Sequence, residues 1–122
     1  MTHTHIELEA LVQQWATDRQ IIPNSTPVAQ ARKTLEEAGE LLEAAARIDA
    51  LRGPATLGGK AQRDYYQAFN DYADAVGDVL VTLIIGAALA DVAITDCLQQ
   101  AYNTIKDRKG YLRADGIFVK EA

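Results

Sequence analysis

The stretch VLVTLIIGAALA, residues 79–90, is apolar on nearly every side of a helix. A helix that is hydrophobic all round is expected at the centre of a structure. The stretch ends a longer helical pattern, from about Ala61 to Ala90, whose apolar face is made of Tyr65, Phe69, Tyr72, Val76, Leu80 and Leu83. The spacing of these residues predicts one long central helix.

Two more helices are predicted before it. Thr4, followed three residues later by Glu7, is a capping-box pattern that begins a helix over residues 5–19. The prolines and polar residues of 21–27 predict a loop that ends in a Thr26 cap, with Pro27 at the first helical position. The second helix continues to about Leu51. The stretch GPATLGGK, residues 53–60, is expected to connect it to the central helix.

A fourth helix is predicted after the central one. Thr95 is its expected cap and Gly110 its expected terminator, and the tail, residues 111–122, is expected to form a short extended hairpin or arm. No strand pattern is strong and no internal repeat is present. We therefore expect one all-α domain over residues 1–122, a four-helix bundle with a short C-terminal arm.

Length and charge narrow the class of protein. A chain of 122 residues buries a limited fraction of its surface, so we expect the bundle to be completed by oligomerisation. The net charge of −5 argues against a nucleic-acid partner. The apolar run 79–90 is shorter than the roughly 18 residues of a membrane span, and the single Cys97 favours a reducing compartment. We expect a soluble, cytoplasmic protein with no membrane partner.

Acidic residues gather on the second helix. At helical spacing, Glu36, Glu40 and Glu43 share a face with Lys33 and Arg47. This pattern is also typical of a solvated face with i,i+4 ion pairs, and that alternative stays open. The opposite arc is expected to be buried, and it carries Leu35, Ala38, Leu42 and Ala45. Glu37 lies on the border of that arc, where a carboxylate needs a partner.

A second acidic group, Asp71, Asp74 and Asp78, lies on the central helix. Its stripe continues into apolar residues, so we expect these aspartates to point inward. No lysine, arginine or histidine occurs in residues 65–91. Desolvated carboxylates repel one another unless they are protonated, paired with cations or bound to metal. A group of oxygen ligands without histidine or cysteine suits Mg²⁺, with Mn²⁺ as an alternative.

These two motifs resemble those of a known family. QARKTLEEAGEL, residues 30–41, resembles the K-x-x-E-E-x-x-E-L signature of MazG-like nucleoside triphosphate pyrophosphohydrolases, and DAVGDVLVTL, residues 74–83, resembles the family's second acidic motif in a phage-type variant. A tryptophan helix around QQWATDRQ and the later AYNTIKDRKG extend the similarity. One departure is Ala75, which stands where the family's motif has glutamate.

The resemblance implies hydrolysis of a nucleoside triphosphate to the monophosphate and pyrophosphate, and a homodimer or homotetramer. It implies metal ligation by Glu37, Glu40 and Asp78. Asp74, on the same side of the helix as Asp78, is a candidate to replace the missing glutamate directly or through water. Glu36 is a candidate general base. The candidate substrate contacts are Lys33, Asn103, Lys106, Arg108 and Trp15, although Trp15 also fits the apolar stripe of its own helix.

Two alternatives remain. A di-iron or di-manganese bundle also uses acids from facing helices, but that design includes Glu-x-x-His on two helices and this chain has no histidine after His5. A catalytically silent bundle that binds nucleotide or a protein as a regulator is favoured by Ala75. Mutual repulsion among six or seven retained acids argues against the silent bundle.

Overall fold

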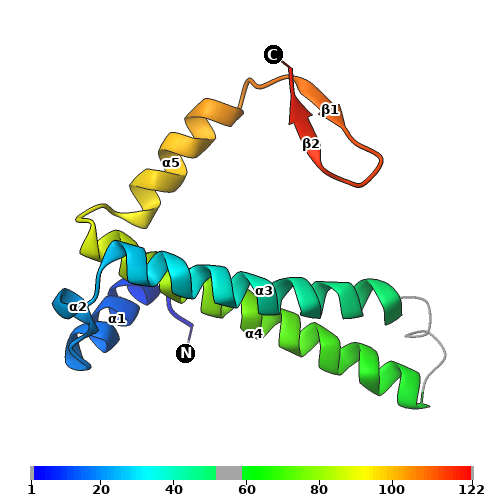
Figure 1. Ribbon diagram of the computed structural model, residues 1–122, viewed down its shortest axis with the longest axis horizontal. Coiled ribbons are helices and arrows are strands. Elements are labelled where there is room, and N and C mark those ends of the chain that lie inside the picture. Colours follow the sequence, from blue (N-terminus) through cyan, green and yellow to red (C-terminus); the bar gives the residue numbers. More distant parts are fainter. Residues whose placement is uncertain (1, 52–58, 122) are drawn as a thin grey trace. The chain divides into compact units, whose positions relative to one another are not determined.

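The computed structural model describes residues 2–51 and 59–121 (Figure 1). In this part of the chain the fold is all-α, as predicted. Its elements are α1 (His5–Asp18), α2 (Ile21–Asn24), α3 (Pro27–Leu51), α4 (Gly59–Leu89), α5 (Ile94–Ile105) and a hairpin of β1 (Gly110–Leu112) and β2 (Phe118–Lys120). They fall into two compact units, Met1–Asp91 and Val92–Ala122, each of which is described by itself.

The predicted helix starts of α1 and α3 are confirmed. At α1 the Thr4 hydroxyl accepts a hydrogen bond from the Glu7 amide at 3.2 Å, and the Glu7 carboxylate accepts one from the Thr4 amide at 3.1 Å. The bond from the Thr4 backbone N–H lowers the pKa of Glu7, because it stabilises the charged carboxylate. At α3 the Thr26 hydroxyl accepts from the Ala29 amide at 3.0 Å.

The prediction of a loop over residues 21–27 is wrong for its first part. Residues 21–24 form α2, which contains a cis peptide bond between Ile22 and Pro23. The Ser25 amide donates to the Ile21 carbonyl at 2.8 Å and closes this single turn. Prolines exclude a long helix but tolerate one turn. The predicted helix stop at 52–54 and most of the connector lie outside the described residues, and residues 59 and 60 already belong to α4.

In the second unit, α5 begins and ends earlier along the chain than predicted. The N-cap of α5 is Ala93, whose carbonyl accepts from the Cys97 amide at 3.0 Å, so Thr95 lies inside the helix. The helix ends at Ile105, and Lys106 is its C-cap. Gly110 belongs to β1, where a Cβ atom would clash with the backbone of β2. Packing within the predicted hairpin therefore explains this glycine better than helix termination does.

The first unit is built on α3 and α4, which lie antiparallel and side by side (Figure 1). Small side chains allow their close approach, because Ala44 of α3 and Ala68 and Ala75 of α4 are almost completely buried. The hydroxyls of Thr34 and Thr82 lie 2.7 Å apart across the same contact. Helices α1 and α2 pack against α4.

The two predictions about which faces of α3 and α4 point inward are wrong for this unit. Leu35 and Leu42 were expected in the core but are 75% and 71% exposed. Asp74 and Asp78, expected to point inward, are exposed. The reason is the small contact surface: α3 turns its Glu37, Ala44 and Ile48 side towards α4, and the aspartates flank that contact.

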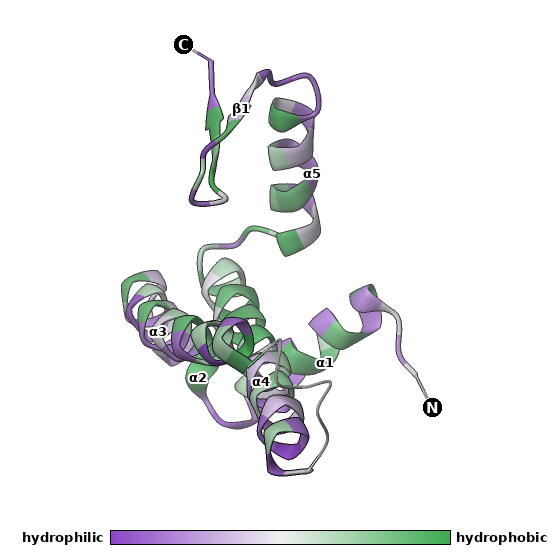
Figure 2. Ribbon diagram, turned by 90° about the vertical axis from the view of Figure 1, so that its right-hand side faces the viewer, coloured by the Kyte–Doolittle hydropathy of each residue, from purple (hydrophilic) through white to green (hydrophobic). Residues whose placement is uncertain are grey.

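The face of α4 that carries its large apolar side chains is also partly open. Residues spaced three, four or seven apart along α4 keep between 36% and 56% of their surface exposed: Tyr66, Phe69, Val76, Leu80 and Leu83. We call this set the outer stripe of α4. Figure 2 shows that α4 is hydrophilic at its N-terminal end and hydrophobic in the part that precedes α5. By length and composition alone α4 would pass for a membrane span.

Candidate functional site: a carboxylate group between α3 and α4

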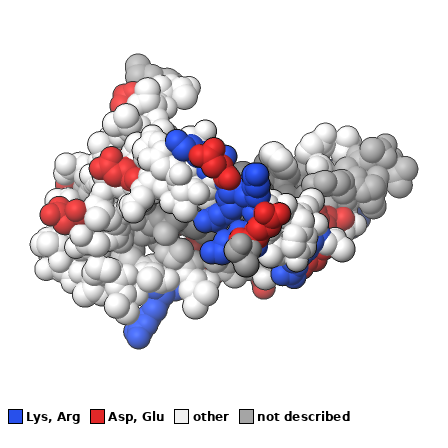
Figure 3. All heavy atoms as spheres, turned by 90° about the horizontal axis from the view of Figure 1, so that it is seen from above, with Lys and Arg blue, Asp and Glu red and all other residues white. Residues whose placement is uncertain are grey.

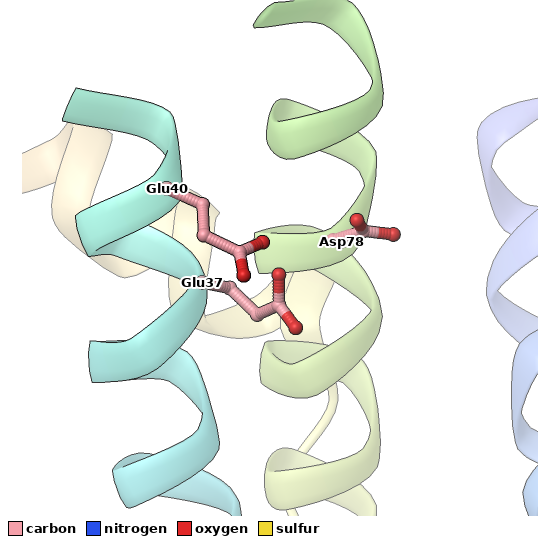
Figure 4. Close-up of side chains that lie close together, drawn as sticks. All are labelled: Glu37, Glu40 and Asp78. Carbon is pink, nitrogen blue, oxygen red and sulfur yellow. The ribbon is translucent and has the colours of Figure 1, made fainter. Parts of the chain in front are cut away.

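Three carboxylates meet at the contact between α3 and α4. Glu37 and Glu40 project from consecutive turns of α3 towards α4, and α4 supplies Asp78 (Figure 4). One oxygen atom of each residue lies within 4.8 Å of the others. We call these three residues the carboxylate group. Its members are those that the sequence motifs predicted as principal metal ligands.

Glu37 is the buried member of this group. Its side chain is only 12% exposed, and its Oε1 atom lies 3.5 Å from Lys33 Nζ. Its Oε2 atom is buried and has no hydrogen-bond partner in the described structure. A buried carboxylate oxygen without a partner is unfavourable, because it loses its hydration and gains nothing in return. A cation at this position would provide the missing interaction.

Neighbouring residues shift the pKa of Glu40. A hydrogen bond with Glu37, and then the repulsion from the charge of Glu37, raises the pKa of Glu40 above its usual value of 4.5. Burial and the charge of Glu36 act in the same direction, and Lys33 opposes them. The ionised form of Glu40 is therefore disfavoured, and a divalent cation would relieve this effect.

Lys33 partly neutralises one end of the carboxylate group. Its ammonium lies 3.2 Å from Glu36 Oε1 and 3.5 Å from Glu37 Oε1. The hydrogen bond and the charge of Glu36 raise the pKa of Lys33, and Glu37 adds to this effect. The predicted general base Glu36 is thus an exposed ion-pair partner of Lys33, on the solvent side of the group.

A cavity of about 340 Å³ adjoins the carboxylate group. Its lining is mostly charged and comprises Glu40, Glu43, Arg47, Asp71, Asp74 and Asp78, together with the buried Ala44 and Ala75. Asp74 lines this cavity but is not one of the three mutually close carboxylates. A role through an intervening water molecule fits that position better than direct ligation.

Arg47 was placed with Glu43 on a solvated face, and the structure gives it a different partner. Its Nη1 atom donates to Asp71 Oδ2 at 3.0 Å. Asp71 also accepts from Gln67 Nε2 at 2.9 Å. A sequence signal for this residue exists, because Lys33, Glu40 and Arg47 are spaced seven residues apart and so share one side of α3.

The remaining predicted site residues belong to α1 and to the second unit. Trp15 of α1 is 44% exposed, and the Arg19 guanidinium lies 4.4 Å from the centre of its ring. Asn103 belongs to α5, and Lys106 and Arg108 follow it, so all three lie in the second unit. There Asn103 and Arg108 line a cavity of about 400 Å³ with Lys109 and Lys120.

The chain matches no family model, and comparison with curated proteins and with solved structures finds no match.

Proposed function

We propose that the chain is a magnesium-dependent nucleoside triphosphate pyrophosphohydrolase of the MazG-like kind. The observation that carries the proposal is the buried, unpartnered Oε2 atom of Glu37 within the carboxylate group of Glu37, Glu40 and Asp78. Three acids that converge in this way are unfavourable without a cation. Their oxygen-only chemistry suits Mg²⁺ or Mn²⁺.

The exposure of the group supports a catalytic site more than a structural ion site. Glu40 and Asp78 are exposed, and both also line the adjoining cavity. A phosphate chain can therefore reach an ion held by these residues. Bound magnesium would neutralise the charge of the phosphates and orient them.

The other side chains take roles around this ion. Glu37 and Glu40 would hold it from α3 and Asp78 would hold it from α4. Glu36 accepts a proton from the attacking water once Lys33 turns from Glu36 to the phosphates. Asn103, Lys106, Arg108 and Trp15 are proposed contacts to the phosphates, the sugar or the base.

We also propose a homodimer or homotetramer in which the four-helix bundle is completed between copies. The outer stripe of α4 supports this, because an apolar row along a helix is the pattern that pairs helices of different chains. Figure 3 shows acidic and basic side chains next to one another near the middle of the face in view, where white marks all other residues, polar or apolar. We propose a cytoplasmic location, and the aspartates at 71, 74 and 78 of α4 argue against a bilayer around this helix, since charges within a bilayer are costly.

A silent, nucleotide-binding regulator is the second candidate. Ala75 is buried, with 5% of its surface exposed, and its methyl side chain cannot bind a metal. The fourth ligand of the family's motif is therefore absent. The Lys33 ammonium already compensates part of the charge of Glu36 and Glu37. A protein of this kind would bind nucleotide and magnesium but release no pyrophosphate.

The deciding experiment measures pyrophosphate release from a panel of ribo- and deoxyribonucleoside triphosphates, with magnesium and with EDTA. We expect magnesium-dependent turnover that falls at least about a hundredfold in Glu40→Gln and in Asp78→Asn. Glu43→Gln is the matched control, because Glu43 lines the cavity but lies outside the carboxylate group. Folded protein that shows no turnover with any triphosphate would favour the silent regulator.

A further inference from the structure

Arg47 is a cation at the carboxylate cavity to which neither the sequence motifs nor the proposed mechanism gives a role. We infer that Arg47 exchanges its partner Asp71 for the phosphate chain of the nucleotide and is a substrate-binding residue. The inference rests on the proposed function, because it assumes a phosphate ligand at the carboxylate group.

The position of Arg47 on α3 supports this role. Arg47 follows Glu40 by seven residues on α3, which places it on the same side of the helix and about 10.5 Å further along the axis. Lys33 precedes Glu40 by the same interval. The ion-binding residues therefore have one cation on each side along α3. A triphosphate that extends from the ion along the cavity meets Arg47, because Arg47 is part of the cavity lining.

The ion pair between Arg47 and Asp71 is weak enough to be exchanged. The side chains of Arg47 and Asp71 are 53% and 34% exposed, and ion pairs this accessible to water contribute little stability. Asp71 keeps the hydrogen bond from Gln67 when Arg47 leaves it. The exchange therefore leaves no buried group without a partner.

The chemistry of the guanidinium group also favours Arg47 as a phosphate-binding residue. A guanidinium donates two parallel hydrogen bonds to phosphate oxygens, and its charge does not depend on pH in the neutral range. Lys33 is less available, because its ammonium is shared between Glu36 and Glu37. Asp71, in contrast, is outside the carboxylate group, so the release of Arg47 does not disturb the residues that hold the ion.

The competing explanation is that the pair only joins α3 to α4. Two variants separate the explanations, since Arg47→Gln and Asp71→Asn both remove the ion pair but only the first removes the cation from the cavity. A purely structural pair predicts the same effect in both variants. A phosphate-binding Arg47 predicts different effects, because only Arg47→Gln should weaken phosphate binding.

The first measurement is steady-state hydrolysis of the preferred triphosphate. We expect Arg47→Gln to raise KM about tenfold or more, and Arg47→Lys to raise it less because the charge is kept. We expect Asp71→Asn to leave KM unchanged or to lower it, since Arg47 is then free. Equal increases in KM in Arg47→Gln and Asp71→Asn, or no increase in Arg47→Gln, overturn the inference.

The second measurement does not need turnover. Calorimetric titration of each folded variant with inorganic tripolyphosphate and magnesium should show affinity reduced about tenfold in Arg47→Gln and retained in Asp71→Asn. If the natural protein binds the tripolyphosphate but hydrolyses no nucleotide, the proposed hydrolysis fails, and the Arg47 inference stands when Arg47→Gln loses affinity and Asp71→Asn keeps it. If the natural protein does not bind tripolyphosphate, the Arg47 inference itself is wrong. Thermal unfolding of both variants establishes that they are folded.

Discussion

The pKa of Glu40 is raised because Glu37 shares a hydrogen bond with it and repels its charge. Glu36 adds repulsion, Lys33 offsets part of it, and Asp78 completes the group from α4. A raised pKa means that the folded protein binds this proton more tightly than the unfolded chain does. The ionised form of Glu40 therefore destabilises the metal-free protein above the raised pKa, and this effect is relieved as the pH falls towards 4.5.

This linkage predicts a pH-dependent effect of Glu40→Gln in EDTA. At neutral pH we expect the variant to melt slightly above the natural protein, because one interacting charge is absent. The difference should shrink as the pH is lowered towards 4.5, where Glu40 is increasingly protonated and resembles glutamine. Thermal unfolding followed by circular dichroism from pH 8 to pH 4.5 measures it.

Glu43→Gln is the control for this prediction, because Glu43 lies outside the carboxylate group. It should show no convergence of this kind with the natural protein. A difference between Glu40→Gln and the natural protein that stays constant or grows on acidification would contradict the described coupling of Glu40 to Glu37.

At the scale of elements, the contact between α3 and α4 depends on small side chains. Gly86 of α4 is close to α3, since a Cβ atom at this position would lie 3.3 Å from the Cβ atom of Gln30. Gly39 of α3 has open space, because no atom of the described structure lies within 4 Å of a Cβ placed there. Both glycines are inside helices, where alanine is favoured by up to about 1 kcal/mol.

Alanine substitutions at these two glycines should therefore differ. Gly39→Ala is expected to raise the free energy of unfolding by about 0.5–1 kcal/mol through helix propensity alone. Gly86→Ala is expected to gain less or to lose stability, because the new methyl group presses α3 away from α4. Urea unfolding of both variants tests the difference. An equal gain in both would mean that α3 and α4 pack less closely than described.

At the scale of the whole molecule, the apolar core of the described residues is small. Its buried apolar members are Ala16, Ala44, Ile48, Ala68, Ala75, Ile84 and Ile85, and no large side chain in the described residues is fully buried. Large apolar side chains instead lie on the outer stripe of α4 and at Leu35 and Leu42 of α3. Covering such surfaces is a main source of stability in oligomers of small chains.

We therefore predict that the protein is an oligomer that depends on the outer stripe of α4. Leu80→Lys places a charge within this stripe and should shift the assembly towards monomer or unfold it, because a buried lysine is unfavourable. Leu42→Lys is the matched control, with the same substitution at an exposed leucine of α3. Light scattering coupled to size exclusion measures the mass of each variant.

The outcomes of this experiment are distinct. A monomeric natural protein would contradict the prediction. Dissociation by Leu42→Lys together with an intact Leu80→Lys assembly would move the interface to α3. Partition of the natural protein into lipid vesicles would instead indicate that a bilayer covers α4.

Local sequence signals determined where three of the helices of the first unit form. The Thr4 and Thr26 caps, Pro27 and the apolar periodicity predicted helices close to α1, α3 and α4, because such signals act within one or two turns. The same periodicity placed Glu37 and Glu40 on adjoining turns of one helix. The family motifs added Asp78 to this group, and the described structure brings all three together.

Tertiary structure decided which side of each helix points inward. Periodicity shows which residues share a face of a helix but not which element covers that face. It therefore predicted Leu35 and Leu42 in the core, whereas alanines and Glu37 form the contact with α4. The partner of Arg47 was likewise invisible, because Asp71 lies 24 residues away in the sequence and is brought near only by the antiparallel packing of α3 and α4. Contacts between distant residues depend on how helices pack, and that is set by the fit of whole surfaces.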